Sequence, residues 1–203
     1  MTARKVSAIL LAAGFSSRMG ELKALLPWKG KTLIEYQIEQ LLEVGLAEII
    51  VVLGYRAEEL QKRISAYDVI TVLNENYPNG KSTSIQKGVS CVADDIDGIL
   101  VSAVDQPVSS ETLRILIRAF HQTKRKVLIP VYQEKRGHPV LFSVSVKRDL
   151  MKVNEESKGL RNVIQKYHDA IEHIPVNEPH VLLNLNNLDD YLVGTSLDQQ
   201  WKT

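Results

Sequence analysis

A short loop rich in small residues follows the first apolar run of the chain. The run Val6–Leu11 leads into Ala13 and Gly14, and Gly20 and Lys23 follow shortly after. Small residues let backbone N–H groups approach anionic oxygens closely, and the loop after the first strand of an open parallel sheet is the usual phosphate site. The residues that this pattern predicts to bind a nucleotide are Leu11, Ala12, Ala13, Gly14, Ser16, Ser17, Arg18, Met19, Gly20 and Lys23.

Two cations of this loop have the chemistry to act on phosphate oxygens. The planar guanidinium of Arg18 can bind two phosphate oxygens at once, and Lys23 can place a point charge near the reacting phosphorus. Ser16 and Ser17 add hydroxyl donors. The alternative is a glycine-rich turn with scattered surface charges, but the length of the pattern directly after an apolar run favours phosphate binding.

Two familiar nucleotide motifs do not fit this spacing. The dinucleotide pattern Gly-x-Gly-x-x-Gly requires glycines where this chain has Ser16 and Met19. The segment Gly80–Thr83 resembles the end of a Walker A loop, but the earlier glycine of that motif is replaced by Glu75. The sequence therefore predicts neither a nicotinamide enzyme nor an ATPase of the Walker type.

A carboxylate follows a second apolar run. Asp105 comes just after Gly98–Ala103, and the carboxyl ends of parallel strands meet at one edge of a sheet, so we expect Asp105 near the glycine loop. A carboxylate is a suitable hard ligand for Mg²⁺. The alternative is a turn-capping role before Pro107. With Mg²⁺ on Asp105, and with Lys23 and Arg18, catalysis would rest on positioning and charge neutralisation without an enzyme nucleophile.

The elements that must position these residues alternate between strand and helix. Runs that are apolar on both faces, such as Glu48–Leu53, are typical of a parallel sheet covered by helices on each side. The sequence therefore predicts an α/β fold, a three-layer α/β/α sandwich. Strands are expected at Val6–Leu11, Glu48–Leu53, Val69–Leu73, Gly98–Ala103, Val127–Val131, Val140–Phe142 and Val181–Leu185, and helices at Thr32–Val44, Ala57–Ser65, Ser82–Ala93, Ser110–His121 and from Leu188.

Composition favours a small-molecule enzyme. The 203 residues, 44% of them hydrophobic, predict one domain over residues 1–203. The net charge of +1 gives no electrostatic basis for a nucleic-acid or membrane partner. The single cysteine, Cys91, cannot form an internal disulfide, and Val6–Ala13 is too short for a membrane span. We therefore expect a cytoplasmic protein.

Further motifs extend along nearly the whole chain. They are Leu25-Leu26-Pro27 with Gly30, Val52-Leu53-Gly54, Gly80-x₃-Ser84-Ile85 with Gly88-Val89, Asp105-Gln106-Pro107, Arg136-Gly137-His138-Pro139-Val140, Gly159-Leu160-Arg161 and the tail Asn184-Leu185-Asn186-Asn187-Leu188-Asp189-Asp190-Tyr191. Together with the glycine loop, these motifs resemble the MobA-like nucleotidyltransferases, and among them the molybdenum cofactor cytidylyltransferases. The resemblance implies a Rossmann-like, mostly parallel sheet of the nucleotide-diphospho-sugar transferase type.

The resemblance also implies an activity and its partners. In such enzymes CMP is transferred from CTP to the terminal phosphate of the molybdopterin of molybdenum cofactor, and pyrophosphate is released. Mg²⁺, or Mn²⁺ in its place, is the expected cofactor. The product would serve the maturation of a molybdenum hydroxylase such as xanthine dehydrogenase.

Further site residues are carried over from the resemblance. The base and ribose are expected against Leu53, Gly54, Gly80, Ser82 and Ser84, the acceptor against His138 and Pro139, and a second metal contact at Asn186. Ser84 could instead be a first-turn hydroxyl of a helix. His138 could be purely structural. The family commonly has acids where this chain has Asn184 and Asn186, and an amide oxygen brings no charge to the ion.

Several readings of the substrates stay open. With Ala13, the loop resembles that of the CTP-using enzymes, whereas the GTP-using ones carry a second glycine at this position. Asparagines in the tail motif, in contrast, also occur in guanylyl-transferring relatives. The alternatives are a guanylyltransferase on the same cofactor, a cytidylyltransferase acting on a sugar or polyol phosphate, and a non-catalytic carrier of the cofactor. Turnover with pyrophosphate release would distinguish the enzymes from the carrier.

Overall fold

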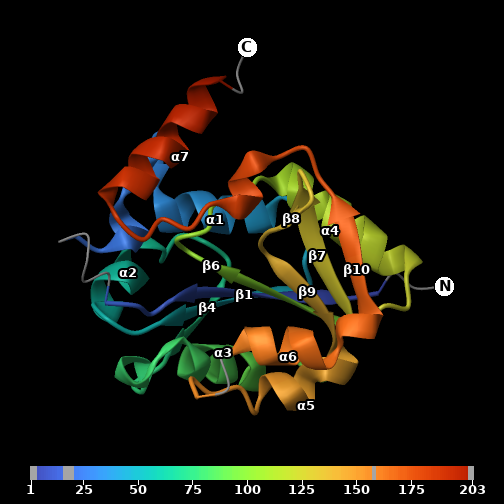
Figure 1. Ribbon diagram of the computed structural model, residues 1–203. Coiled ribbons are helices and arrows are strands. Elements are labelled where there is room, and N and C mark those ends of the chain that lie inside the picture. Colours follow the sequence, from blue (N-terminus) through green and yellow to red (C-terminus); the bar gives the residue numbers. More distant parts are fainter. Residues whose placement is uncertain (1–3, 16–20, 157–158, 201–203) are drawn as a thin grey trace.

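The fold is built on one central sheet with helices on both faces (Figure 1). The computed structural model describes residues 4–15, 21–156 and 159–200, without the side chains of residues 198–200. The strands of the central sheet are β1 Val6–Ala12, β4 Glu48–Leu53, β5 Ile70–Leu73, β6 Gly98–Ala103, β7 Val127–Tyr132, β8 Lys135–Arg136, β9 Val140–Ser143 and β10 Ile171–Pro175. A small separate sheet pairs β2 Pro27–Trp28 with β3 Lys31–Thr32.

The strands run in the order β10-β7-β9-β6-β1-β4-β5, and β8 pairs with β7. β1 pairs in parallel with both β4 and β6, and β4 pairs in parallel with β5. β9 is antiparallel to β6 and β7, whereas β10 is parallel to β7. The sheet is therefore mostly parallel, with β9 reversed between two parallel groups and the short β8 antiparallel to β7.

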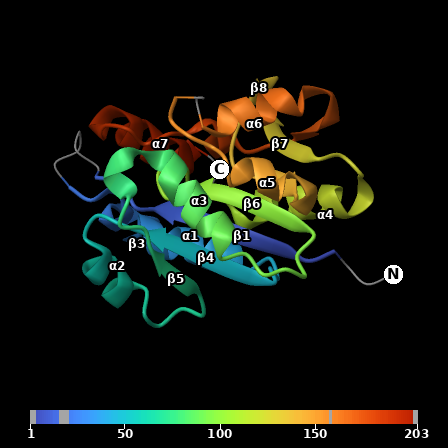
Figure 2. The ribbon, with the colours of Figure 1, turned by 90° about the horizontal axis from the view of Figure 1, so that it is seen from below.

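The helices cover both faces of this sheet, as Figures 1 and 2 show from two directions. Their bounds are α1 Leu33–Leu42, α2 Ala57–Arg63, α3 Lys81–Ser90, α4 Ser110–Gln122, α5 Lys147–Leu150, α6 Leu160–Lys166 and α7 Leu188–Gln200. Short 3-10 turns lie at Lys23–Leu25, Tyr77–Asn79, Val144–Val146, His168–Ala170 and Pro179–Leu182.

The alternation of side chains along β1 divides the core into two parts. Ala8 and Leu10 pack on one face with apolar residues of α1, α2 and α4. Ile9 and Leu11 pack on the other face with residues of α3, α5 and α6. Successive strand residues point to opposite sides of the sheet, so apolar side chains lie on both faces, and the helices bury them there. This confirms the predicted α/β/α sandwich.

Most of the expected elements are present within a few residues, and two bounds, Glu48–Leu53 and Gly98–Ala103, coincide with the observed strands. The strand expected at Val181–Leu185 is wrong. Pro179–Leu182 forms a 3-10 turn instead, and the edge position beside β7 is taken by Ile171–Pro175. Val181 and Leu185 are buried, so their apolar character reflects core packing rather than pairing in the sheet.

Among the described residues, no helix is both long and apolar enough to cross a membrane.

The close approach of α3 to the sheet depends on Gly88. A Cβ at this position would lie 2.5 Å from Ile9 Cγ2 and 3.1 Å from Val52 Cγ2. We expect Gly88→Ala to lower the free energy of unfolding by about 1–3 kcal/mol, because extra volume in a packed core forces side chains and backbone to shift. Urea denaturation would measure the change, with Lys87→Ala, exposed on the same helix, as control. Equal stability of the two variants would contradict this packing.

Candidate active site

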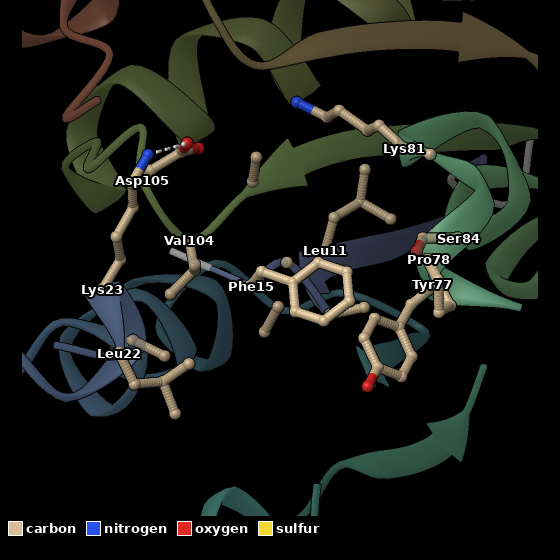
Figure 3. A pocket seen from close by; sticks show the side chains of 16 residues that line it. Leu11, Phe15, Leu22, Lys23, Tyr77, Pro78, Lys81, Ser84, Val104 and Asp105 are labelled. Atoms are coloured by element: carbon tan, nitrogen blue, oxygen red, sulfur yellow. Dashed lines mark hydrogen bonds and ion pairs between the residues drawn. The ribbon is translucent and has the colours of Figure 1, made fainter. Parts of the chain in front are cut away.

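A cavity of about 300 Å³ opens where the carboxyl ends of β1 and β6 meet. The chain passes from β1 to β4 and β5 on one side and then to β6 on the other, so this is the point at which the strand order reverses. Ligands of open α/β sheets bind at such points. Figure 3 shows the cavity, which is lined by Leu11, Ala12, Ala13, Gly14, Phe15, Leu22, Lys23, Ala24, Tyr77, Pro78, Gly80, Lys81, Ser84, Ala103, Val104 and Asp105.

The loop after β1 is held from behind by the loop after β4. Tyr55 N donates to Ala13 O at 3.1 Å. A Cβ at Gly54 would lie 2.8 Å from both the Cβ of Ala13 and the Cβ of Tyr77, so a side chain does not fit there. Leu53 and Gly54 were expected to contact a base. Neither residue lines this cavity: Leu53 pairs with Ala12 in the sheet, and Gly54 packs against Ala13, so their contacts with a base stay predictions.

The predicted charged residues converge at one end of the cavity. Lys23 Nζ lies 3.2 Å from Asp105 Oδ2 and 3.5 Å from Asn186 Oδ1. The side chains of Lys23 and Asp105 are only 14% and 22% exposed, which strengthens their attraction because little water screens it. Asp105 and Asn186 lie 82 and 163 positions after Lys23 in the sequence, and the fold brings both side chains to its ammonium group.

Asp105 owes its position to a buried amide from helix α1. Gln37 Nε2 donates to Ala103 O at 3.2 Å and to Gln106 O at 2.7 Å, and so fixes the turn that follows β6. Gln37 is 1% exposed, and satisfying buried backbone carbonyls avoids a desolvation cost. The turn itself is closed by Gln106 N, which donates to Ala103 O at 3.0 Å.

Asn186 is positioned by the start of helix α7. Asp190 Oδ2 accepts from Asn187 N at 3.3 Å, and Asn187 Oδ1 accepts from Asp190 N at 2.8 Å, a reciprocal cap of the helix. Asp190 Oδ2 also accepts from Asn186 N at 2.9 Å. Leu185 N donates to Asp105 O at 2.9 Å, which ties the tail segment to the turn after β6. Asn184 is exposed.

The oxygen atoms of Asp105 and Asn186 suit a hard divalent cation. Both oxygens attract the ammonium of Lys23, so this point of the site already favours positive charge. Carboxylate and amide oxygens are ordinary ligands of Mg²⁺ and Mn²⁺. Within the described part of the chain, no group of three or more His, Cys, Asp or Glu residues could hold a metal ion. A cation bound here would therefore need further oxygens, such as those of a triphosphate.

The start of helix α3 forms the other end of the cavity. Ser84 lines it, and Ser84 Oγ accepts a hydrogen bond from Asn74 Nδ2 at 2.9 Å. Gly80 also lines the cavity, with φ +108°. Ser82 was expected to contact the nucleotide, but it does not line the cavity. Its backbone N–H donates to Glu155 Oε1 at 2.6 Å, and its buried Oγ has no hydrogen-bond partner among the residues that the structure describes.

His138 lies beside this site in a neutral form. It precedes Pro139 across a cis peptide bond, and its backbone N–H donates to Val181 O at 2.8 Å. The pKa of His138 is lowered to about 4, chiefly by burial; the positive charge of Lys81, and to a smaller extent that of Arg161, also lowers it, whereas Asp105 opposes the shift. A neutral imidazole can both donate and accept a hydrogen bond.

Some predicted residues lie outside the described part of the chain, namely Ser16, Ser17, Arg18, Met19 and Gly20. Their proposed contacts with phosphates stay predictions.

Sequence reasoning missed several residues around the cavity. Phe15 and Tyr77 line it, and Lys81 extends from the start of α3 toward the side on which Asp105 lies (Figure 3). Phe15 directly follows Gly14, so an aromatic residue in an otherwise small and polar loop was a usable signal. Gln37 carried a similar signal, because it interrupts the apolar face of α1.

The electrostatic surroundings of His138 can be tested directly. We expect its ring to stay neutral from pH 8 down to pH 5, because its pKa lies near 4. Lys81→Met should raise this pKa, since it removes a positive charge that opposes protonation. Long-range ¹H–¹⁵N NMR of the imidazole ring measures both effects. Lys87→Met on the same helix is the control, and titration of wild-type His138 close to pH 6.5 would refute the arrangement.

Comparisons with known proteins connect this geometry to a family. The model of the MobA-like NTP transferase domain matches residues 8–171. The molybdenum cofactor cytidylyltransferase of Escherichia coli is 26% identical over 190 residues, which cover 93% of this chain and 95% of that protein. A probable molybdenum cofactor guanylyltransferase of Bacillus mycoides is 30% identical over 76% of each chain.

A relative with a different printed activity is also similar. Nicotine blue oxidoreductase of Paenarthrobacter nicotinovorans is 32% identical over 70% of this chain and 72% of its own. Among solved structures, a nucleotidyl transferase from Methanothermobacter thermautotroptrophicus superposes with a TM-score of 0.82 at 29% identity, covering 97% of this chain and 98% of that one. The manganese complex of Rv0371C from Mycobacterium tuberculosis shares the fold, with a TM-score of 0.78 at 22% identity over 93% and 97% of the two chains.

Proposed function

Because the chain belongs to the MobA-like NTP transferase family, and is thus a nucleotidyltransferase, we propose that it transfers CMP from CTP to molybdenum cofactor. The acceptor would be the terminal phosphate of the molybdopterin, and the second product pyrophosphate. Residues 1–203 would act as one domain in the cytoplasm and supply a molybdenum hydroxylase such as xanthine dehydrogenase. The observation that carries the proposal is the meeting of Lys23, Asp105 and Asn186 at the end of the glycine loop.

The proposed reaction is an in-line displacement. An oxygen of the acceptor phosphate attacks the α-phosphorus of CTP, a new P–O–P bond forms, and the bond between the α-phosphorus and the bridging oxygen of pyrophosphate breaks. No enzyme nucleophile is needed, so the site contributes positioning and charge. Lys23 would neutralise charge at the α-phosphate, with Arg18 of the loop holding the other phosphate oxygens.

Asp105 and Asn186 would hold a divalent cation, Mg²⁺ or Mn²⁺. When bound, the ion supplies a positive charge shared by the phosphate oxygens. The ion would compete with the Lys23 ammonium for Asp105 and Asn186, and Lys23 would then contact the nucleotide. The protein ligands bring only one negative charge, so the affinity of the ion should depend on the triphosphate.

The choice of nucleotide rests on the loop and on α3. Ala13 lines the cavity where a second glycine would leave more room, which favours the smaller pyrimidine base. Gly80 and Ser84 would contact the base and ribose, whereas Leu53, Gly54 and Ser82 would shape the site from outside its lining. The neutral ring of His138, with Pro139, would face the acceptor.

A guanylyltransferase acting on the same cofactor is the second candidate. Asn186 in place of an acid and the similarity to the Bacillus protein favour it. A sugar or polyol phosphate acceptor and a non-catalytic carrier of the cofactor stay alternatives. A redox reaction like that named for the Paenarthrobacter relative finds no support in the glycine loop, which lacks the dinucleotide spacing.

Pyrophosphate release is the first test. Purified protein with Mg²⁺ and molybdenum cofactor should release pyrophosphate with CTP and little with GTP. Release with GTP alone would move the assignment to the guanylyltransferase. No release with either nucleotide, while the cofactor still binds, would favour the carrier.

Asp105→Asn tests the charged end of the cavity. We expect turnover to fall by about 10²-fold or more, because the variant loses a charge that is preorganised for the reaction. The Mg²⁺ concentration needed for half-maximal activity should rise. The fold should be retained, since Leu185 N bonds to the backbone oxygen of residue 105 and not to its side chain.

A matched control for this variant is Asp68→Asn. Asp68 is exposed and precedes the amino end of β5, whereas Asp105 follows the carboxyl end of β6. Near wild-type turnover of Asp105→Asn would refute the role of Asp105, and equal losses in both variants would indicate a general effect of charge.

A further inference from the structure

Three aromatic rings from three separate segments meet at the mouth of the cavity. The ring centroid of Phe15 lies 4.9 Å from that of Tyr77 and 5.3 Å from that of Tyr55, and the two tyrosine rings are 6.5 Å apart. Phe15 follows the glycine loop, Tyr55 follows β4, and Tyr77 lies in the turn before α3. Figure 3 shows Phe15 and Tyr77 side by side at the cavity.

These rings leave aromatic surface open to solvent. Phe15 is 48% exposed and Tyr55 is 37% exposed. The rings are tilted by 44–57° rather than stacked face to face, so they do not cover one another. Single exposed apolar residues are common on protein surfaces, but an aromatic cluster on the rim of a binding cavity is a ready surface for a planar ligand.

The cavity has two chemically different ends. Lys23 and Asp105 provide charge at one end, and Phe15 and Tyr77 with the hydroxyl of Ser84 define the other (Figure 3). A nucleoside triphosphate has the same division, with charge on the phosphates and a flat aromatic base at the opposite end. If the phosphates lie near Lys23, the base must lie toward the rings.

We propose that Phe15, supported by Tyr55 and Tyr77, is the surface on which the nucleobase stacks. The inference rests on the proposed function, because it takes the ligand to be a nucleoside triphosphate. Ser84 Oγ already accepts a hydrogen bond from Asn74, which leaves its own O–H to donate to the edge of the base. The ring therefore provides affinity, and the edge contacts provide the choice of base.

This division of labour has a measurable consequence. Stacking on an aromatic side chain tolerates every base, because every base has a π face. Loss of the Phe15 ring should then weaken the binding of CTP and of GTP by a similar factor, about tenfold or more. Inorganic tripolyphosphate, which has no base, should bind equally well with and without the ring.

The experiment measures binding of CTP, GTP and tripolyphosphate by calorimetry in the presence of Mg²⁺. The variants are Phe15→Ala, Phe15→Leu, which stays apolar but has no ring, and Phe15→Tyr, which keeps the ring. We expect both ringless variants to lose nucleotide affinity and Phe15→Tyr to retain it. Ile70→Ala is the matched control, because Ile70 is 46% exposed at the far edge of the sheet.

A spectroscopic readout complements these affinities. In Phe15→Trp, the new indole should report stacking through a change in its fluorescence when CTP binds. Tripolyphosphate should produce no such change. Wild-type protein treated in the same way corrects for its native tryptophans, of which Trp28 is buried.

Three outcomes would overturn the proposal. Unchanged CTP affinity in Phe15→Ala would show that the ring does not contact the base. An equal loss for tripolyphosphate would show that Phe15 acts on the phosphate loop instead. In a further titration with molybdopterin, a loss of molybdopterin binding in Phe15→Ala with CTP binding intact would assign the rings to the acceptor. Failure of the wild-type protein to bind any nucleoside triphosphate would instead refute the proposed function itself.

Discussion

The structure depends on the parallel pairing of β1 with β4 on one side and with β6 on the other. This register places the residues that follow three buried strands at the same edge of the sheet. Tyr55 N, in the loop after β4, donates to Ala13 O, and Val104 N, in the turn after β6, donates to Leu11 O at 3.0 Å. Both neighbouring loops are thus fixed to the end of β1 and the residue that follows it. A shift of one residue in the pairing of β1 with β6 would turn the side chains of β6 to the opposite core faces and move Asp105 relative to Lys23.

The charged end of the cavity is assembled from short segments that are far apart in the sequence. Lys23 comes from a 3-10 turn, Asp105 from a short turn and Asn186 from the segment before α7. Gln37 of α1 donates to the backbone carbonyls of Ala103 and Gln106 on either side of Asp105, and Asp190 of α7 accepts from the backbone N–H of Asn186. Such support from surrounding packing keeps reactive groups in a fixed geometry.

Much of this arrangement could be predicted from the sequence, because it follows from local patterns. Runs such as Glu48–Leu53 fix the strand type and the layers, and the carboxyl-edge rule places Asp105 near the glycine loop. The failures arise where tertiary competition decides. Val181 and Leu185 are apolar as strand residues are, yet Ile171–Pro175 occupies the edge beside β7. The roles of Gln37 and Tyr77 depend on partners distant in sequence, and no local pattern gives those pairings.

Asn186 places an uncharged amide, and not a second carboxylate, beside Lys23 and Asp105. Asp105 and Lys23 together carry no net charge, whereas a second carboxylate would leave one negative charge unneutralised. A site with excess negative charge attracts a free divalent cation and repels a triphosphate. In the proposed reaction, the neutral pair of Lys23 and Asp105 would favour an ion that arrives already bound to the triphosphate, whose oxygens would complete the coordination. In the proposed reaction, metal binding at Asp105 and Asn186 would therefore depend on the triphosphate, and phosphate oxygens that take the place of Asp105 beside Lys23 would keep this ammonium paired.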